Sequence, residues 1–507
     1  MEINPVRNNN NRNNPKNIGR ISNGVNSQTQ RKNQNQDLVE SFSGIRGIYG
    51  QSITEQFAYR YAWSYCQLFR NKALSLIIGG DSRSSTPILK KAMIKAFNDW
   101  GIEKIIDVGV VPIQVCEYGI LKFKTSGGVY ISASHNEPEY NGWKFLKKDG
   151  ALLYPEQANQ LIKKAHEIPG RKPKITKLRR KVINKHKEIV DEYIRFVLKK
   201  IGPTAVDKIK KSKLKILVDP NGGSGIVILK ELFKKLGLRV KIINNKLGQF
   251  VRLIEPNVSS LAYLKKQVDS GKFEFGCGFD CDADRIEFVI PSISKFAKEM
   301  GPVVSGQYVL ALACDAYLEG IKNQVVVTND CTSYLVRDII KKYGAKIKEV
   351  EVGEMVVVEE MEKQKSIIGG EGSCGGVIIP PIKCRDGIMS TVLILKMIVE
   401  KERSLVDILE NYPKYYSERT VTSCSPVKVI KIKNKLEKYF KGKGYKVKKT
   451  GGITGGLKAS IDKNSYIWFR QSKTEPGTFR IITDGDDYRK VKKILKEGIK
   501  LFNKFKE

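Results

Sequence analysis

Short apolar runs that alternate with amphipathic stretches constrain the fold of this chain more than any other feature of its sequence. Three clear pairs of an expected strand and an expected helix lie at 74–78 and 87–100, 214–218 and 226–236, and 324–327 and 333–343. A repeated order of strand, turn rich in Gly or Asp, and helix is typical of α/β units. The sequence therefore predicts several α/β domains in tandem.

The chain is too long for one domain. It has 507 residues, whereas a single hydrophobic core stops growing at roughly 250–300 residues. Its hydrophobic content of 41% is high enough for buried cores and excludes a wholly disordered protein. Beyond about residue 411 the pattern changes to a smaller α+β region, with strands expected near 466–470 and 480–482 and a final helix expected from about Asp487.

These patterns divide the chain into five expected parts. The first is a tail rich in Asn and Gln, which we expect to be disordered because it cannot bury enough apolar surface. The expected parts are the tail at 1–36, an α/β domain with a serine loop at 37–190, an α/β domain with an acidic loop at 191–295, an α/β domain with a glycine-rich loop at 296–410, and an α+β domain at 411–507. We expect linkers near 188–213, 291–302 and 404–418.

Charge and cysteine content narrow the class of protein. Ninety Lys and Arg residues against 53 Asp and Glu residues give a net charge of +37, but the excess is spread along the chain without a nucleic-acid-binding motif. A solvated basic surface, which also suits small anionic substrates, is the better interpretation. No apolar run reaches the roughly 20 residues of a membrane span, and no signal peptide is evident. Nine scattered cysteines do not form a disulfide framework, so we expect a cytoplasmic protein.

An acidic loop at 276–285 is the strongest chemical signal. In GCGFDCDADR, Asp280, Asp282 and Asp284 alternate with small or apolar residues directly after an expected strand. Buried carboxylates without partners are costly, and Mg²⁺ prefers oxygen ligands. The pattern therefore favours a metal site over a solvated acidic turn.

A second loop, GVYISASHNEPEYNGWK at 128–144, places Ser134 in a polar turn near His135 and Lys144. A serine needs a base or a positive field to act as a nucleophile. Taken alone, a serine that only caps the local backbone is the better interpretation of this loop.

Two further loops suit a phosphorylated sugar. RQSKTEPGTFR at 470–480 offers Arg side chains, hydroxyls and backbone N–H groups for a phosphate, although a charged surface hairpin explains it equally well. GGEGSCGG at 369–376, followed by RDG at 385–387, presents Glu371 and Ser373 to sugar hydroxyls, with a structural glycine turn as the alternative.

The order of these loops, together with SGIRG at 43–47 and GGDSR at 79–83, resembles the α-D-phosphohexomutase family over about residues 38–485. This family includes phosphomannomutase/phosphoglucomutase and phosphoglucosamine mutase. The resemblance implies three related α/β domains and a smaller C-terminal α+β domain around a central active-site cleft. It also implies an intramolecular phosphotransferase that interconverts hexose 1-phosphate and 6-phosphate, of mannose or glucose or of glucosamine, through a phosphoserine and a sugar bisphosphate.

The resemblance also implies a role for each matching residue. Ser134 would carry the transferable phosphate, which would ligate Mg²⁺ together with Asp280, Asp282 and Asp284. The remaining implied roles are cationic and proton-transfer residues at Arg46, Lys144 and Arg285, sugar contacts at Glu371 and Ser373, and a site for the non-transferred phosphate at Arg470, Ser472 and Thr474. Expected cofactors are Mg²⁺ and a sugar 1,6-bisphosphate activator. Expected partners are a phosphorylated hexose or hexosamine, with no nucleic acid or membrane, and the chain is expected to be a monomer or homodimer.

Some positions depart from the family pattern. Phe42 stands where the family has Thr. Cys374 looks like an insertion in the glycine-rich loop, and the histidine that many members carry after this loop is absent here. The segment that usually reads Val-Gly-His or Val-Gly-Asp ends here in Glu354. The general base is therefore open: Lys144 is the first candidate and Glu354 the second. Two other functions stay open, namely a phosphatase of the haloacid dehalogenase type that uses the acidic loop, and a catalytically dead basic scaffold.

Overall fold

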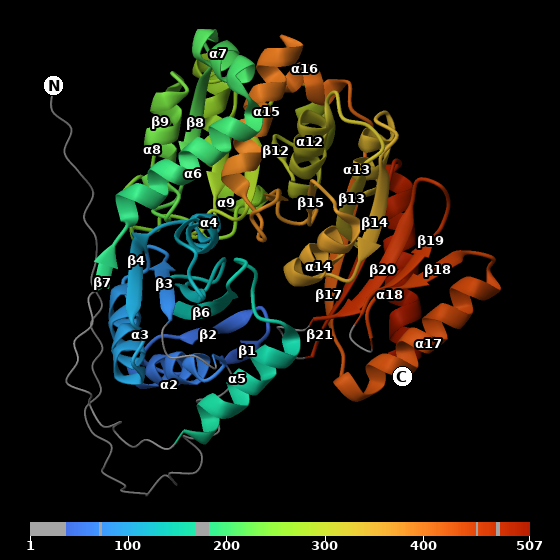
Figure 1. Ribbon diagram of the computed structural model, residues 1–507. Coiled ribbons are helices and arrows are strands. Elements are labelled where there is room, and N and C mark those ends of the chain that lie inside the picture. The colour runs from blue at the N-terminus through green and yellow to red at the C-terminus, as the bar shows by residue number, and fades with distance from the viewer. Residues whose placement is uncertain (1–36, 70–73, 169–181, 453–454, 473–476, 507) are drawn as a thin grey trace, which may run out of the picture. The chain divides into compact units, whose positions relative to one another are not determined.

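The computed structural model describes residues 37–69, 74–168, 182–452, 455–472 and 477–506 (Figure 1). The expected tail at 1–36 lies outside the described residues. The described part of the chain contains four β-sheets, of which three mix strand directions with helical crossovers and the last is antiparallel. The predicted fold class, three α/β domains followed by an α+β domain, is confirmed.

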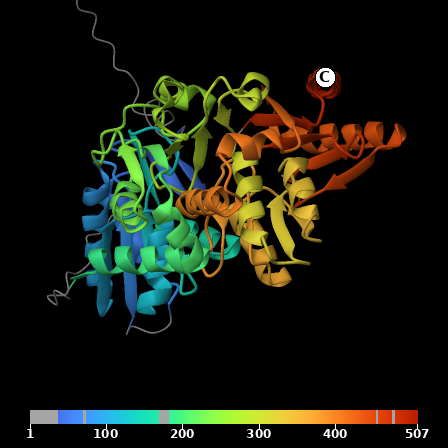
Figure 2. The same cartoon turned by 90° about the horizontal axis from the view of Figure 1, so that it is seen from above.

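The first sheet has helices on both faces. Its strands, in spatial order, are β1 (Val39–Ser41), β2 (Gly44–Ile48), β6 (Tyr140–Lys147), β5 (Gly127–Ile131), β3 (Ser75–Gly80), β4 (Lys104–Val110) and β7 (Val182–Asn184). Along β3, Leu76 and Ile78 join one core cluster and Ile77 joins another, because successive side chains of a strand point to opposite faces. The helices of the first cluster are α2 (Glu55–Cys66), α3 (Thr86–Trp100) and α5 (Pro155–Glu167), and those of the second include α4 (Ile113–Phe123) and α6 (His186–Ile201) (Figure 2).

The second sheet positions the acidic loop. Its strands are β12 (Val303–Val304), β11 (Ile286–Val289), β10 (Gly276–Phe279), β8 (Lys215–Asp219) and β9 (Arg239–Ile242). Since β10 and β11 are adjacent antiparallel strands, the acidic loop between them is held at both ends by the sheet. The helices that accompany this sheet are α7 (Pro203–Lys211), α8 (Ile226–Lys235), α9 (Val258–Leu261), α10 (Leu264–Gln267), the π-helix η1 (Val268–Lys272) and α11 (Lys295–Met300).

The third sheet carries the glycine-rich loop between two short strands. Its strands are β14 (Lys346–Val350), β13 (Val325–Asn329), β15 (Gly369–Gly370) and β16 (Val377–Ile378). Its helices are α12 (Gly306–Leu318), α13 (Tyr334–Lys341), α14 (Glu354–Gln364), α15 (Gly387–Lys401) and α16 (Leu405–Glu410). Helix α15 is apolar on nearly all sides because it is buried in the largest core cluster, which also contains residues of α4, α6 and α12.

The fourth sheet is antiparallel throughout. Its strands are β17 (Tyr416–Ser423), β21 (Thr478–Gly485), β20 (Tyr466–Gln471), β19 (Leu457–Ser460) and β18 (Lys446–Lys449). Two amphipathic helices, α17 (Pro426–Gly442) and α18 (Tyr488–Lys506), pack on it through residues such as Leu436 and Phe502. The expected strands and the final helix of this region are present.

The expected linker at 188–213 is wrong, because this stretch consists largely of α6 and α7. The stretches 291–302 and 404–418 contain the short helices α11 and α16, and their role as linkers stays a prediction. In α6, Ile189, Tyr193 and Val197 recur at a spacing of four and are fully buried, so this charged stretch is an amphipathic helix. The domain boundaries and the central cleft stay predictions.

All nine cysteines lie among the described residues as buried free thiols. Within the described ranges, none of the helices combines the length and the apolar character that crossing a membrane requires.

Candidate active site

The three aspartates of the acidic loop converge. Asp280, Asp282 and Asp284 are fully buried, and each offers a carboxylate oxygen that lies within 4.8 Å of the other two. Between them Ala283 adopts a left-handed backbone conformation with φ of 56°, which curls the loop. One oxygen of each carboxylate has no hydrogen-bond partner in the described part of the chain. Three converging buried oxygens of this kind fit a hard divalent cation such as Mg²⁺.

The electrostatics of the loop favour the binding of a cation by its three carboxylates. Burial raises the pKa of Asp280 well above its ordinary value, and Asp284 and Asp282 raise it further. Burial followed by Asp284 also raises the pKa of Asp282. For Asp284, burial opposes ionisation, but neighbouring cations led by Arg385 hold its pKa below the ordinary value. A divalent cation at the three free oxygens would favour the ionised form of all three groups.

The serine loop lies against the acidic loop. Ser134 follows β5, is buried, and has a left-handed backbone with φ of 54°. Its N–H donates to Ser132 Oγ at 2.8 Å, and the Ser132 hydroxyl in turn lies 3.5 Å from Asp282 Oδ2. The structure therefore brings the predicted phosphate carrier and the predicted metal ligands together from the first and second sheets.

Arg83 holds the serine loop in place, a role that we did not infer from the sequence. Its guanidinium donates to the carbonyl oxygens of Ser134 at 3.0 Å and of Tyr140 at 2.8 Å, and it also contacts the carbonyl of Asn136. A buried ion pair of 2.8 Å with Asp81 fixes its orientation. The signal was present in GGDSR, where an Asp and an Arg two residues apart follow a strand.

Lys144 and Arg46 approach the same cluster from the first sheet. Lys144 Nζ lies 3.6 Å from Asp282 Oδ2, and the side chain is buried. Burial opposes its charge, but nearby carboxylates, led by Asp282, raise the pKa of Lys144. Arg46 donates to Asn136 Oδ1 at 3.2 Å, and burial, followed by repulsion from Arg285, lowers its pKa to about 10.

Arg285 connects the acidic loop to the serine loop. Its backbone N–H donates to Asp280 Oδ1 at 3.1 Å, and its Nε lies 3.9 Å from carboxylate oxygens of Asp280 and Asp284. Its Nη2 lies 3.0 Å from Nδ1 of His135, the residue after Ser134. An ion pair with Glu255 completes its surroundings.

Arg385 is the second residue to which we gave no role from the sequence. Its guanidinium contacts Asp284 at 2.5 Å, Glu371 at 2.6 Å and Glu354 at 3.4 Å, and its backbone N–H donates to Glu354 at 3.0 Å. It therefore joins the acidic loop, the glycine-rich loop and the start of α14. The motif RDG was visible in the sequence, but its partners are far away along the chain.

The two predicted sugar contacts differ in their surroundings. Glu371 is buried, and its carboxylate accepts hydrogen bonds from Asn329 Nδ2 at 2.9 Å and from the Gly353 N–H at 3.0 Å, besides that from Arg385. Burial opposes its charge, but Arg385 and these donors lower the pKa of Glu371. Ser373 is exposed, and its Oγ lies 3.3 Å from Cys374 Sγ.

The predicted phosphate site adjoins the same network. Arg470 on β20 donates to the carbonyl oxygen of Val352 at 3.3 Å and lies 3.5 Å from Glu351, so it contacts the segment that leads through Gly353 to Glu371. The Ser472 N–H donates to the carbonyl of Thr478 at 2.8 Å across the β20–β21 turn. Thr474 lies outside the described residues.

Comparisons with known proteins agree with this geometry. The family profile described as "Phosphoglucomutase/phosphomannomutase, alpha/beta/alpha domain I" matches residues 40–171, the profile for domain II matches 191–292, and that for domain III matches 305–416. The phosphoglucomutase/phosphomannomutase of Thermococcus kodakarensis is 31% identical over 470 residues, covering 90% of this chain and 97% of that protein. The chain belongs to the phosphoglucomutase/phosphomannomutase family. The predicted relationship to the α-D-phosphohexomutases is thereby confirmed.

Other relatives in this family carry different names. A probable phosphoglucosamine mutase of Pyrococcus horikoshii is 28% identical over 459 residues, which is 90% of this chain and 96% of that protein. Among solved structures, the open form of the phosphoglucomutase pp63/parafusin from Paramecium superposes with a TM-score of 0.76 at 18% identity, over 92% of this chain and 95% of that one. It therefore agrees with the fold.

One solved relative of the phosphohexomutase fold contains ligands. The N-acetylphosphoglucosamine mutase of Aspergillus fumigatus was solved in complex with GlcNAc-6P and magnesium, and it matches with a TM-score of 0.55 at 11% identity over 92% of this chain and 96% of that one.

Membership of the phosphohexomutase family removes the phosphatase of the haloacid dehalogenase type from the alternatives.

Proposed function

We propose that the protein interconverts the 1-phosphate and the 6-phosphate of a hexose or hexosamine, using Ser134 as the carrier of the transferred phosphoryl group. One observation carries the proposal: the loop of Ser134, three buried aspartates with free oxygens, and a set of buried cations form a single contact network. Such a network can hold a phosphoryl group and offset its charge.

In the first step, the phosphorylated Ser134 donates its phosphoryl group to the free hydroxyl of the bound sugar monophosphate. The bond from phosphorus to Ser134 Oγ breaks as a bond from phosphorus to the sugar oxygen forms, and the sugar hydroxyl loses its proton. Arg46, Lys144 and Arg285 lie where they can offset charge on the transferring group. Arg83 keeps the carrier loop in position.

A group near the serine must accept the sugar proton. Lys144 is our first candidate and would accept the proton from its neutral form, which burial favours and the carboxylates led by Asp282 oppose by raising its pKa. Glu354 is the second candidate. Glu354 is held by the backbone and side chain of Arg385, and Lys144 and Glu354 interact electrostatically. Substituting each and comparing the pH dependence of kcat distinguishes them, because removal of the true base abolishes the acidic limb of the profile.

In the second step, the sugar bisphosphate turns over and its other phosphate returns to Ser134, which regenerates the phosphoserine and releases the isomeric monophosphate. The phosphate that does not react is held by Arg470, Ser472 and Thr474, and sugar hydroxyls contact Glu371 and Ser373. The contact of Arg470 with Val352 supports this assignment, because it places the phosphate loop next to the segment that anchors Glu371.

Mg²⁺ is the expected metal, held by Asp280, Asp282, Asp284 and the phosphate on Ser134. When bound, it would offset negative charge on the transferring phosphoryl group. A trace of sugar 1,6-bisphosphate is the expected activator, because it phosphorylates Ser134 at the start.

The test is a coupled assay with Mg²⁺ and a trace of sugar bisphosphate on the 1- and 6-phosphates of glucose, mannose and glucosamine. Turnover of one pair, lost in Ser134→Ala and retained in Ser84→Ala, supports the proposal and names the sugar. Ser84 is a suitable control because it is an exposed serine next to Arg83. Absence of turnover on every pair, with Ser134 unphosphorylated by mass spectrometry after bisphosphate treatment, would favour the catalytically dead scaffold.

A further inference from the structure

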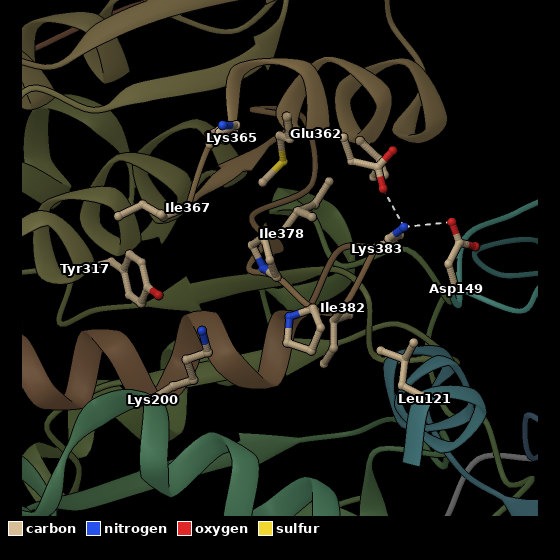
Figure 3. A pocket seen from close by; sticks show the side chains of 15 residues that line it. Leu121, Asp149, Lys200, Tyr317, Glu362, Lys365, Ile367, Ile378, Ile382 and Lys383 are labelled. Carbon is tan, nitrogen blue, oxygen red and sulfur yellow. Dashed lines mark hydrogen bonds and ion pairs between the residues drawn. The ribbon is translucent and has the colours of Figure 1, made fainter. Parts of the chain in front are cut away.

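A cavity of about 460 Å³ lies apart from the residues of the candidate active site (Figure 3). Its walls come from segments that are far apart in the sequence, including α4, α6, α12 and α14. The volume is within the roughly 300–1,000 Å³ of small-molecule sites, and such sites often lie where domains meet. None of its lining residues has a role in the mechanism proposed above.

Most of the cavity wall is apolar. Ile378 and Ile382 lie in the middle of the view in Figure 3, Ile367 lies beside Tyr317, and Leu121 lies at the opposite side. Pro380 and Pro381 add rigid apolar surface to the same wall. A wall of this composition favours the apolar body of a ligand over a sugar or a nucleotide.

Lys200 and Tyr317 present partly buried polar groups to the cavity. The ammonium of Lys200 and the hydroxyl of Tyr317 make no hydrogen bond or ion pair with the described residues, and the contact recorded for Lys200 Nζ is with the ring of Phe196 at 5.7 Å. Burial, with a smaller effect of Lys199, lowers the pKa of Lys200, and burial raises the pKa of Tyr317. Figure 3 shows both side chains reaching into the cavity. Two partly buried hydrogen-bond donors without partners among the described residues fit an acceptor that carries negative charge.

The charged residues around the cavity favour a negatively charged ligand. Lys383 pairs with Asp149 at 2.8 Å and with Glu362, so its charge is already offset. The lining contains three lysines and two carboxylates, so its net charge is positive and favours an anionic ligand.

We propose that this cavity binds a small amphipathic carboxylate, whose carboxylate group accepts hydrogen bonds from Lys200 and Tyr317 and whose apolar chain lies against the isoleucine wall. The site is independent of the proposed phosphoryl transfer. Its residue Lys383, whose N–H donates to Glu117 at 3.1 Å, stands two positions before Arg385 in the chain.

Decanoate is the probe, and decan-1-ol is its neutral counterpart with the same chain. Isothermal titration of the full chain below the micelle concentration is expected to give saturable binding of one decanoate per chain. Decan-1-ol is expected to bind at least about tenfold more weakly, since a charged hydrogen bond is lost. Equal affinity for the two probes, or no saturable binding, would overturn the proposal.

Variants locate the site. Lys200→Met keeps the apolar stem and is expected to weaken decanoate binding by at least about tenfold, and Tyr317→Phe by roughly three- to tenfold. Lys199→Met, which alters the exposed neighbour on α6, is expected to bind like the parent chain. Since Lys200 and Tyr317 are only partly buried, both variants are expected to fold, which circular dichroism checks. Parent-like affinity in Lys200→Met would place decanoate elsewhere and refute the assignment.

Discussion

Glu287→Gln is expected to stabilise the second sheet increasingly as the pH rises. Glu287 lies on β11, is 8% exposed, and accepts a hydrogen bond from the Gly306 N–H through Oε1 at 3.1 Å. Its Oε2 has no hydrogen-bond partner among the described residues. Burial is the main reason that the pKa of Glu287 rises from 4.5 to about 8. Glutamine keeps the acceptor for Gly306 and removes the titrating group.

The magnitude follows from the pKa difference between the folded and unfolded chain. A folded pKa above the unfolded one means that the folded state holds the proton more tightly, so the contribution to stability is complete below about pH 4.5 and is lost as the pH rises through about 8. At ~1.4 kcal/mol for each pH unit, the parent chain loses about 3 kcal/mol from this group by pH 7 and about 5 kcal/mol above pH 8. The variant does not incur this loss.

Amide hydrogen exchange of peptides that cover β10 and β11 is the assay, because a chain with several domains does not unfold in one step. The opening free energy of the variant minus that of the parent is expected to be near zero at pH 5 and to grow towards pH 8.5. Glu231→Gln, an exposed glutamate on α8, serves as the control and is expected to show no dependence on pH. A difference for Glu287→Gln that stays constant from pH 5 to 8.5 would refute the reasoning.

Three further predictions concern the candidate active site. Arg385→Met leaves buried carboxylates unpaired and is expected to lower the free energy of unfolding by roughly 3–5 kcal/mol in thermal or urea unfolding. Arg337→Met, at a more exposed ion pair, is the control and is expected to lower it by less than about 1 kcal/mol. Similar losses in the two variants would contradict a stabilising role of Arg385 in its ion-pair network. Mg²⁺ at 100 times its dissociation constant is expected to stabilise the chain by about 3 kcal/mol. Asp282→Asn is expected to abolish most of that gain in a thermal shift assay. An equal gain in the variant would argue against a metal site at the acidic loop. Arg83→Met is expected to lower kcat by roughly 10–100-fold through misplacement of the Ser134 loop, with KM little changed; an unchanged kcat would remove Arg83 from the positioning residues.

Much of the candidate site could be predicted because its residues lie in short contiguous loops. The spacing of Asp280, Asp282 and Asp284 is local, and a curled loop brings such side chains together whatever the rest of the fold. The same holds for the serine loop, where Ser134 follows a strand. The roles of Arg83 and Arg385 could not be predicted in this way, because their partners come from other loops, 51–57 residues away for Arg83 and 14–101 residues away for Arg385.

The helices and strands, too, could be predicted where their pattern is local and not where it depends on tertiary packing. The apolar run of β3 and the amphipathic pattern of α13 are local, and both elements occur close to the predicted positions. Helix α6 differs from the linker expected near 188–213, because Ile189, Tyr193 and Val197 form a buried stripe between its charged residues. The stripe is buried because α4, α7 and α15 pack against it, and this packing is a property of the tertiary structure.

The sequence by itself determined the tandem α/β architecture, the acidic loop and the family, since each is expressed in short local patterns and in their order along the chain. Tertiary structure alone decided that Arg385 joins Asp284, Glu371 and Glu354, and that Lys200 and Tyr317 line one cavity. The physical reason is that burial and the approach of charges from separate domains set the electrostatics of a site. Neither quantity is a property of the local sequence.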